Sequence, residues 1–132
     1  MGAWGTGTFE NDDAMDFVII LLESDSLSPV EKVLRAVVDV EDYLEVDQGA
    51  NGLAAAEVIA ALRGHPGKLP SELEAWVTKI GTASDEMVTL ARRAVGRIMT
   101  ENSELRDLWE ETDEFSVWQA EVDDLLKRLD AA

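Results

Sequence analysis

The sequence predicts an all-α protein, a single compact bundle of about six to seven short helices. Apolar residues recur at spacings of three and four along most of the chain, as one face of a helix requires. Alanine, leucine and glutamate are common, whereas the chain has only 3 prolines and no convincing β-strand pattern. With 132 residues, of which 46% are hydrophobic, it can bury one core without a metal or a disulfide. We therefore expect a single helical domain over residues 1–132, in which residues 1–10 form an extended strap rich in glycine and tryptophan.

The first two predicted helices follow from their start signals. Asn11 or Asp12 precedes an apolar stripe, so the first helix begins there, although the short apolar run at residues 17–22 is also compatible with a strand. Ser28 as N-cap and Pro29 at the first helical position mark the second start. The residues expected to face the core are Met15, Val18, Ile19 and Leu22 in the first helix and Val30, Val33, Leu34, Val37, Val38, Val40 and Leu44 in the second.

Two shorter helices are predicted in the middle of the chain. A break at residues 48–52 precedes an alanine-rich helix that ends at Gly64. After a loop, Ser71 and Glu74 have the spacing of a capping box at the start of the fourth helix. The residues expected to face the core are Ile59 and Leu62 in the third helix and Leu73, Trp76, Val77 and Ile80 in the fourth.

The last three predicted helices carry the clearest stripes. The stripe from about Ser84 to Ile98 is the most regular, so we expect this segment to be the central helix, with Gly96 allowing a close contact. A short helix follows around Trp109, and the last helix begins at about Ser116. The residues expected to face the core are Met87, Leu90, Ala91, Ala94, Val95, Ile98, Leu105, Leu108, Trp109, Trp118, Val122, Leu125, Leu126 and Leu129.

The charge of the chain is strongly negative and limits its partners. The 28 acidic and 11 basic side chains give a net charge of −17, which repels nucleic acid and anionic lipid and attracts basic proteins. The absence of cysteine excludes a disulfide scaffold and a thiol nucleophile, and no apolar run is long enough to span a membrane. We expect a cytoplasmic protein that binds no nucleic acid, no membrane and no cofactor.

The glycine-rich opening WGTGTFENDD lacks the features of a phosphate-binding loop. Its spacing fits neither common glycine-rich fingerprint, and Asn11, Asp12 and Asp13 open the next helix with acids that would repel a phosphate. We interpret the glycines as turn positions and the side chains of Trp4 and Phe9 as anchors against the bundle. The predicted structural anchors of the whole chain are Trp4, Phe9, Asn11, Trp76, Trp109 and Trp118.

A family resemblance covers nearly the whole chain. It is carried by WGTGTFENDDAMDF, YLEV, LAAAEVIAAL, NSELRDLWEE and a tryptophan near the C-terminus. In these segments the chain resembles a bacterial family catalogued as domain of unknown function 4259. The resemblance implies a small stand-alone bacterial protein, and it implies no reaction, cofactor or catalytic residue.

Few residues are suited to catalysis. The only histidine, His65, lies in a predicted loop, and no G-x-S-x-G motif presents a serine, so we expect no catalytic residue. Asp12 and Asp16 share a helical face on which a divalent cation could bridge them. Acids in a first helical turn are commonly explained by the helix dipole, and we therefore assign no metal ligand.

Two acidic segments are the candidate partner-binding sites. At residues 39–47, carboxylates crowd the predicted C-terminal half of a helix, where they oppose its dipole. At residues 101–114, carboxylates surround Trp109, which is also explained as a core residue of an amphipathic helix. Either the basic cluster at residues 92–97 or a basic partner is expected to offset the first segment. The candidate partner-binding residues are Asp39, Asp42, Glu45, Asp47, Glu110 and Glu111.

These observations lead to three hypotheses about function. The leading one is a non-catalytic protein–protein interaction module, in its most concrete form an inhibitor or immunity-type protein for a basic partner such as a nuclease. The second is an enzyme that uses a divalent metal bound by carboxylates. The third is a homo-oligomeric structural module, because 4 tryptophans exceed what one small core is expected to hide.

Overall fold

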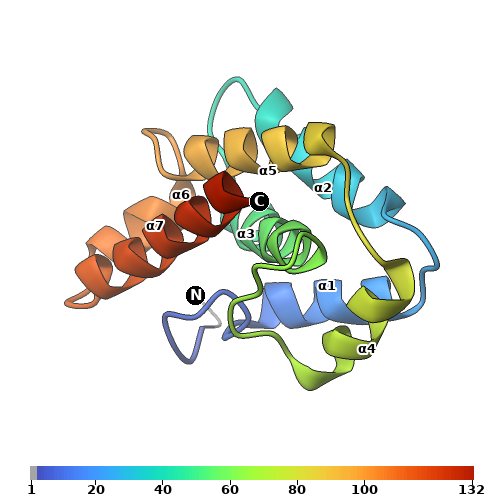
Figure 1. Cartoon of the computed structure of the whole chain (residues 1–132). Coiled ribbons are helices and arrows are strands. Elements are labelled where there is room, and N and C mark those ends of the chain that lie inside the picture. Colours follow the sequence, from blue (N-terminus) through green and yellow to red (C-terminus); the bar gives the residue numbers. More distant parts are fainter. Residues whose placement is uncertain (1–2) are drawn as a thin grey trace.

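In the computed structural model, which describes residues 3–132, six helices surround a seventh (Figure 1). The helices are α1 (Asp12–Leu22), α2 (Ser28–Asp39), α3 (Val46–Leu62), α4 (Ser71–Ile80), α5 (Asp85–Ile98), α6 (Glu104–Glu110) and α7 (Phe115–Ala131). Within these described residues, β-structure is limited to isolated bridges. None of the described helices combines the length and the apolar character that a membrane crossing requires. The fold is all-α, as the sequence predicts.

The central helix is α3, which contacts every other helix (Figure 1). All of its residues from 52 to 62 are buried. Five of these 11 residues are alanine and one is glycine, so neighbouring helices can approach α3 from every side. The predicted break at residues 48–52 and the predicted central position of residues 84–98 are therefore both wrong. A helix that is buried on all sides shows no amphipathic stripe, and the periodicity of the sequence does not reveal it.

A glycine inside α3 marks its closest helix contacts. A Cβ atom at Gly52 would lie 2.9 Å from Cδ1 of Ile98 on α5 and 2.9 Å from Cγ2 of Val37 on α2. At Gly96, for which the sequence predicts a close contact, a Cβ atom would have no neighbour within 4 Å. The residue that resembles a helix break is thus the one that permits the packing.

The segment at residues 12–22 is a helix, which resolves the choice between helix and strand. The side-chain oxygen of Asn11 accepts a hydrogen bond from the Ala14 N–H at 2.8 Å and caps α1. Ile19 and Leu22, predicted to face inward, are 57% and 42% exposed. The buried stripe starts from the small residue Ala14 instead of Met15, and this rotates the inner face. That face consists of Ala14, Phe17, Val18 and Leu21.

The predicted serine caps of two other helices are displaced by one residue. Ser28 and Ser71 are the first helical residues of α2 and α4, and they follow Leu27 and Pro70 as the N-cap residues. Neither cap residue accepts a side-chain hydrogen bond. Proline at position 29 is compatible with the first turn because its missing N–H has no helical acceptor there.

Residues 3–10 form a turn-rich strap that bends back on itself. The Trp4 N–H donates to the Glu10 carbonyl oxygen at 3.0 Å, and Ala3 forms an antiparallel bridge with Asn11. Phe9 is 8% exposed and packs into the core, whereas Trp4 is 61% exposed. Trp4 therefore does not anchor the strap, because the backbone turn carries its indole ring to the surface.

We expect Gly52→Ala and Gly96→Ala to change stability in opposite directions. At Gly96 the added methyl group meets no neighbour, so the lower backbone entropy of alanine should raise the free energy of unfolding by about 0.5–1 kcal/mol. At Gly52 the same gain is outweighed by overpacking of a filled core, which costs about 1–3 kcal/mol. Urea unfolding measures both changes. Equal stabilisation by the two substitutions would show that Ile98 and Val37 leave room for a methyl group at position 52.

Candidate functional site

The two acidic segments meet in the structure. Because α2 ends at Asp39, the residues that follow form a loop instead of a helix end. In this loop, the Leu44 N–H donates to the Asn102 carbonyl oxygen at 2.8 Å, and the Glu104 N–H donates to the Leu44 carbonyl oxygen at 2.9 Å. This parallel bridge places the two segments, which are distant in the sequence, side by side.

Only one carboxylate of the first segment, that of Asp39 at the end of α2, lies at a helix C-terminus. Glu45 is the N-cap residue of α3, and Asp47 lies in its first turn. At this end of a helix a negative charge is stabilising by about 0.3–1 kcal/mol. The Glu45 N–H also donates to Oε1 of Gln48 at 3.1 Å. The prediction that this segment opposes a helix dipole is therefore wrong for every acid after Asp39, because α2 ends at that residue.

Arg97 holds the two segments together through their main chains. Its guanidinium group donates to the carbonyl oxygens of Asp42 at 3.0 Å and Asn102 at 3.2 Å. Arg92, another member of the basic cluster, pairs with Asp130 on α7 at 2.9 Å. Arg97 thus reaches the first acidic segment, but it bonds to a carbonyl oxygen there and leaves the carboxylates facing solvent.

An exposed tyrosine lies among these carboxylates. Tyr43 is 46% exposed, and its hydroxyl donates to Oδ2 of Asp107 at 3.0 Å. Partial loss of water contact raises the pKa of Tyr43, and the hydrogen bond to Asp107 raises it further. The negative charges of Glu104 and Glu111 act in the same direction. We call the surface formed by Tyr43, its chain neighbours Asp42 and Glu45, and the facing acids Glu104, Asp107 and Glu111 the Tyr43 face.

The structure places three of the six candidate partner-binding residues at this face. They are Asp42, Glu45 and Glu111, and all are exposed. The other three are also exposed but lie outside the face as defined: Asp39 ends α2, Asp47 acts on Asp13 of α1, and Glu110 pairs with Arg106. Tyr43 and Asp107 were not singled out from the sequence. An aromatic residue among acids is the sequence signal for such a site, and it is shared by Tyr43 and by Trp109, which is buried.

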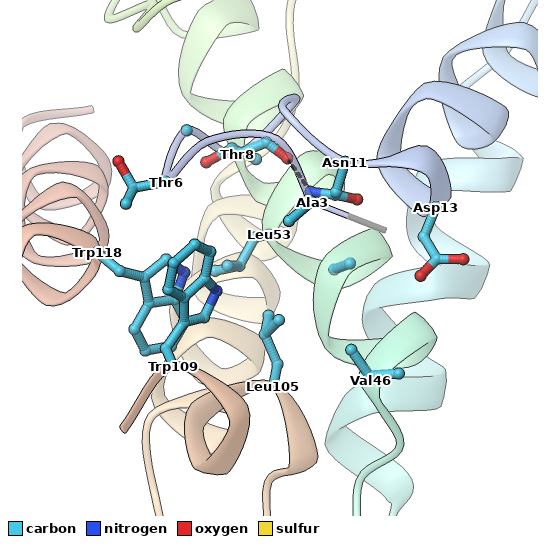
Figure 2. A pocket seen from close by; sticks show the side chains of 12 residues that line it. Ala3, Thr6, Thr8, Asn11, Asp13, Val46, Leu53, Leu105, Trp109 and Trp118 are labelled. Carbon is cyan, nitrogen blue, oxygen red and sulfur yellow. Dashed lines mark hydrogen bonds between the residues drawn. The ribbon is translucent and has the colours of Figure 1, made fainter. Parts of the chain in front are cut away.

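The aromatic anchors predicted in the last two helices pack against each other. Trp109 and Trp118 stack with their ring centroids 6.2 Å apart and are 7% and 3% exposed. Figure 2 shows the two indoles beside Leu53, with Thr6 and Thr8 of the strap above them. The cavity between these groups has a volume of about 20 Å³, enough for one water molecule. This space therefore reflects packing and does not offer a ligand site.

Three of the 4 tryptophans are buried. Besides the stacked pair, Trp76 is 5% exposed, and its indole N–H donates to the Ser24 carbonyl oxygen at 2.8 Å. The core therefore buries all the tryptophans except Trp4, and excess tryptophan gives little support to the hypothesis of a homo-oligomer. Large apolar side chains are exposed on α1 instead, at Ile19 and Ile20.

The acids considered as metal ligands lie at the start of α1. Burial raises the pKa of Asp13, and the negative charges of Asp47 and Asp16 raise it further. Within residues 3–132, no three His, Cys, Asp or Glu side chains are grouped so that they could hold a metal ion. His65 lies in the loop between α3 and α4, as predicted. The metal-dependent enzyme stays a hypothesis based on the sequence alone.

A buried ion pair between α3 and α7 was not predicted from the sequence. Two nitrogens of Arg128 donate to the two carboxylate oxygens of Glu57 at 2.8 Å and 2.9 Å, and Nε of Arg128 donates to Asp124 at 2.8 Å. The side chains of Arg128 and Glu57 are 17% and 7% exposed. The hydrogen bonds to Glu57 raise the pKa of Arg128 above its ordinary value, although burial opposes this. A single acid in an alanine-rich run was the only local signal.

Comparison with known proteins assigns a family to this architecture. The family model described as Domain of unknown function (DUF4259) matches residues 2–121. The chain belongs to the DUF4259 family. The matched range includes the strap and both acidic segments of this DUF4259 protein and ends within α7. No curated protein and no solved structure matches the chain.

We expect Arg128→Met to destabilise the DUF4259 protein strongly. The substitution leaves the Glu57 carboxylate buried without its partner, which costs about 3–5 kcal/mol. The control is Arg35→Met, which breaks an exposed pair with Glu31 at 2.8 Å and should cost at most about 0.5 kcal/mol. Denaturant unfolding measures both. Similar losses in the two variants would show that Glu57 reaches water once Arg128 is removed.

The titration of Tyr43 tests the geometry of the Tyr43 face. The chain has 1 tyrosine, so phenolate absorbance reports this residue alone. We expect Asp107→Asn to lower the pKa of Tyr43, because a negative charge that disfavours the phenolate is removed. Asp123→Asn on α7 is the control and should leave the titration unchanged. If Asp107→Asn leaves the pKa of Tyr43 unchanged, the hydrogen bond between the Tyr43 hydroxyl and Asp107 is not formed in solution.

Proposed function

We propose that this DUF4259 protein is a non-catalytic interaction protein that binds a basic partner protein through the Tyr43 face. The proposal is carried by the pairing of Leu44 with Ser103, which joins two acidic segments around an exposed tyrosine. Tyrosine is enriched among the residues that dominate protein interfaces, because its ring buries apolar surface while its hydroxyl keeps a partner. The bond from Tyr43 to Asp107 already orients the ring and lowers the entropy lost on binding.

The electrostatics of the chain support a partner of positive charge. The net charge is −17, and the carboxylates of the Tyr43 face lie beside an arginine that bonds to main-chain oxygens. Opposite charges on two proteins accelerate their association and make it sensitive to salt. The specific form that we propose is an inhibitor or immunity-type protein that masks a basic enzyme, such as a nuclease, in the bacterial cytoplasm.

Affinity capture from the native cell tests this proposal. We expect the wild-type protein to retain a basic partner at low salt and to release it as the salt concentration rises. With the captured partner purified, Tyr43→Ala should weaken the measured affinity at least about tenfold, as expected for a central interface residue. The matched control is Ile20→Ala, which truncates another exposed apolar residue, 54% exposed, on α1.

Two outcomes would contradict the proposal. One is a captured partner that is acidic, or whose affinity does not depend on salt. The other is equal binding by the wild-type and Tyr43→Ala proteins, which would place the interface away from Tyr43. Thermal unfolding of both variants shows whether a loss of affinity reflects the surface or the fold.

A further inference from the structure

A groove with a volume of about 960 Å³ lies between the strap, the loop that follows α3, and α7. Its walls are residues 7–10, residues 67–70 and one side of α7. Figure 1 shows these three parts of the chain next to one another, with α7 above the strap and the loop. The volume falls in the range of about 300–1,000 Å³ that is common for binding sites. None of the residues of the Tyr43 face lines this groove.

The floor of the groove is the buried pair of Glu57 and Arg128. This pair is bonded to each wall: the Thr8 hydroxyl of the strap donates to Glu57 at 3.4 Å, and Arg128 donates to the His65 carbonyl oxygen at 3.3 Å. Gly67 lies so close to the guanidinium group that a Cβ atom there would be 2.8 Å from one of its nitrogens. The hydrogen bonds of the Glu57–Arg128 pair therefore fix the strap, the loop and α7 relative to one another.

The sides of the groove carry apolar surface that the described part of the chain covers only partly. Val117 of α7 is 49% exposed, and Ala120 one turn further along the helix is also exposed. Met15 of α1 and Leu69 of the loop also line the groove and are partly buried. Apolar side chains of a ligand would lose water contact here, which favours binding.

The charged residues that line the groove are predominantly acidic. Glu10, Glu72 and Glu121 accept hydrogen bonds from neutral donors, namely the Gly7 N–H and the hydroxyls of Ser71 and Thr6. In the described part of the chain, none of these three carboxylates takes part in an ion pair. The charge of Arg128 is already shared by Glu57 and Asp124. Lys68 also lines the groove, but the three carboxylates outnumber its single positive charge. A ligand that complements the groove is therefore both apolar and positively charged.

We propose that this groove binds a short polypeptide segment in which apolar side chains alternate with lysine or arginine. The apolar side chains pack on Val117 and Met15, and the basic side chains pair with Glu72 and Glu121. Such pairing brings together exposed opposite charges over an apolar surface, so charge gives the orientation and apolar burial gives the affinity. This site goes beyond the proposed function, because it needs neither Tyr43 nor either acidic segment.

Two synthetic peptides distinguish this site from general attraction to an acidic protein. One alternates leucine and lysine, and the other replaces every leucine with serine and keeps the charge. At physiological salt we expect the leucine–lysine peptide to shift the NMR signals of residues 67–70 and 116–121 of the full chain. We also expect it to bind at least about tenfold more tightly than the serine–lysine peptide, because only the first buries apolar surface.

A pair of arginine substitutions on α7 completes the test. Ala120→Arg fills the groove and adds a repelling charge, so the affinity for the leucine–lysine peptide should fall at least about tenfold. Gln119→Arg adds the same residue at an exposed position outside the groove and should change the affinity by less than about twofold. Tyr43→Ala should bind the peptide as the wild type does.

Equal binding of the two peptides, signal shifts centred on residues 42–47, or equal losses in the two arginine variants would overturn the groove site. None of these results affects capture of a partner by the Tyr43 face. Conversely, a partner that binds Tyr43→Ala unchanged contradicts the proposed function and leaves the peptide result standing.

Discussion

The close packing around α3 positions every other part of the molecule. Small residues along this helix let all six neighbours contact it, and Gly52 allows α2 and α5 to approach together. The same helix carries one residue of each candidate surface. Glu45, its N-cap residue, belongs to the Tyr43 face, and Glu57 in its interior forms the floor of the groove. The two surfaces are therefore held at fixed positions by one buried helix.

The sequence predicts those helices that bury a single face. In α5, the residues from Met87 to Ile98 follow the expected stripe, because polar side chains occupy the opposite face. The sequence of α3 shows no such stripe, because a helix that is buried on all sides has no contrast between an apolar and a polar face. The candidate site was found only in part for a different reason. The acids were visible as two segments, but the bridge from Leu44 to Ser103 is a contact between distant parts of the chain and has no local signal.

The basic residues explain why the acidic surfaces stay charged. The chain has 11 basic and 28 acidic side chains, and several of the basic ones form hydrogen bonds that hold the fold together. Arg128 compensates the buried Glu57, and Arg97 joins two loops through their carbonyl oxygens. Arg63 of the α3–α4 loop donates to the Ala83 carbonyl oxygen at 3.0 Å. Because these arginines satisfy buried or main-chain groups, they leave the carboxylates of the Tyr43 face and those of Glu10, Glu72 and Glu121 along the groove without an arginine partner among the described residues.

The glycine-rich strap shows how an apparent anion-binding loop is used within the fold. The turn at Gly7 does bind a carboxylate, but the carboxylate is its own: the Gly7 N–H donates to Oε1 of Glu10 at 3.0 Å. Added Cβ atoms at Gly5 and Gly7 would collide with the Glu10 carboxylate, so a larger residue at either position would displace this side chain from the turn. A phosphate would have to displace Glu10 and face a net charge of −17. The strap instead fixes one wall of the groove, since Thr6 donates to Glu121 at 2.8 Å.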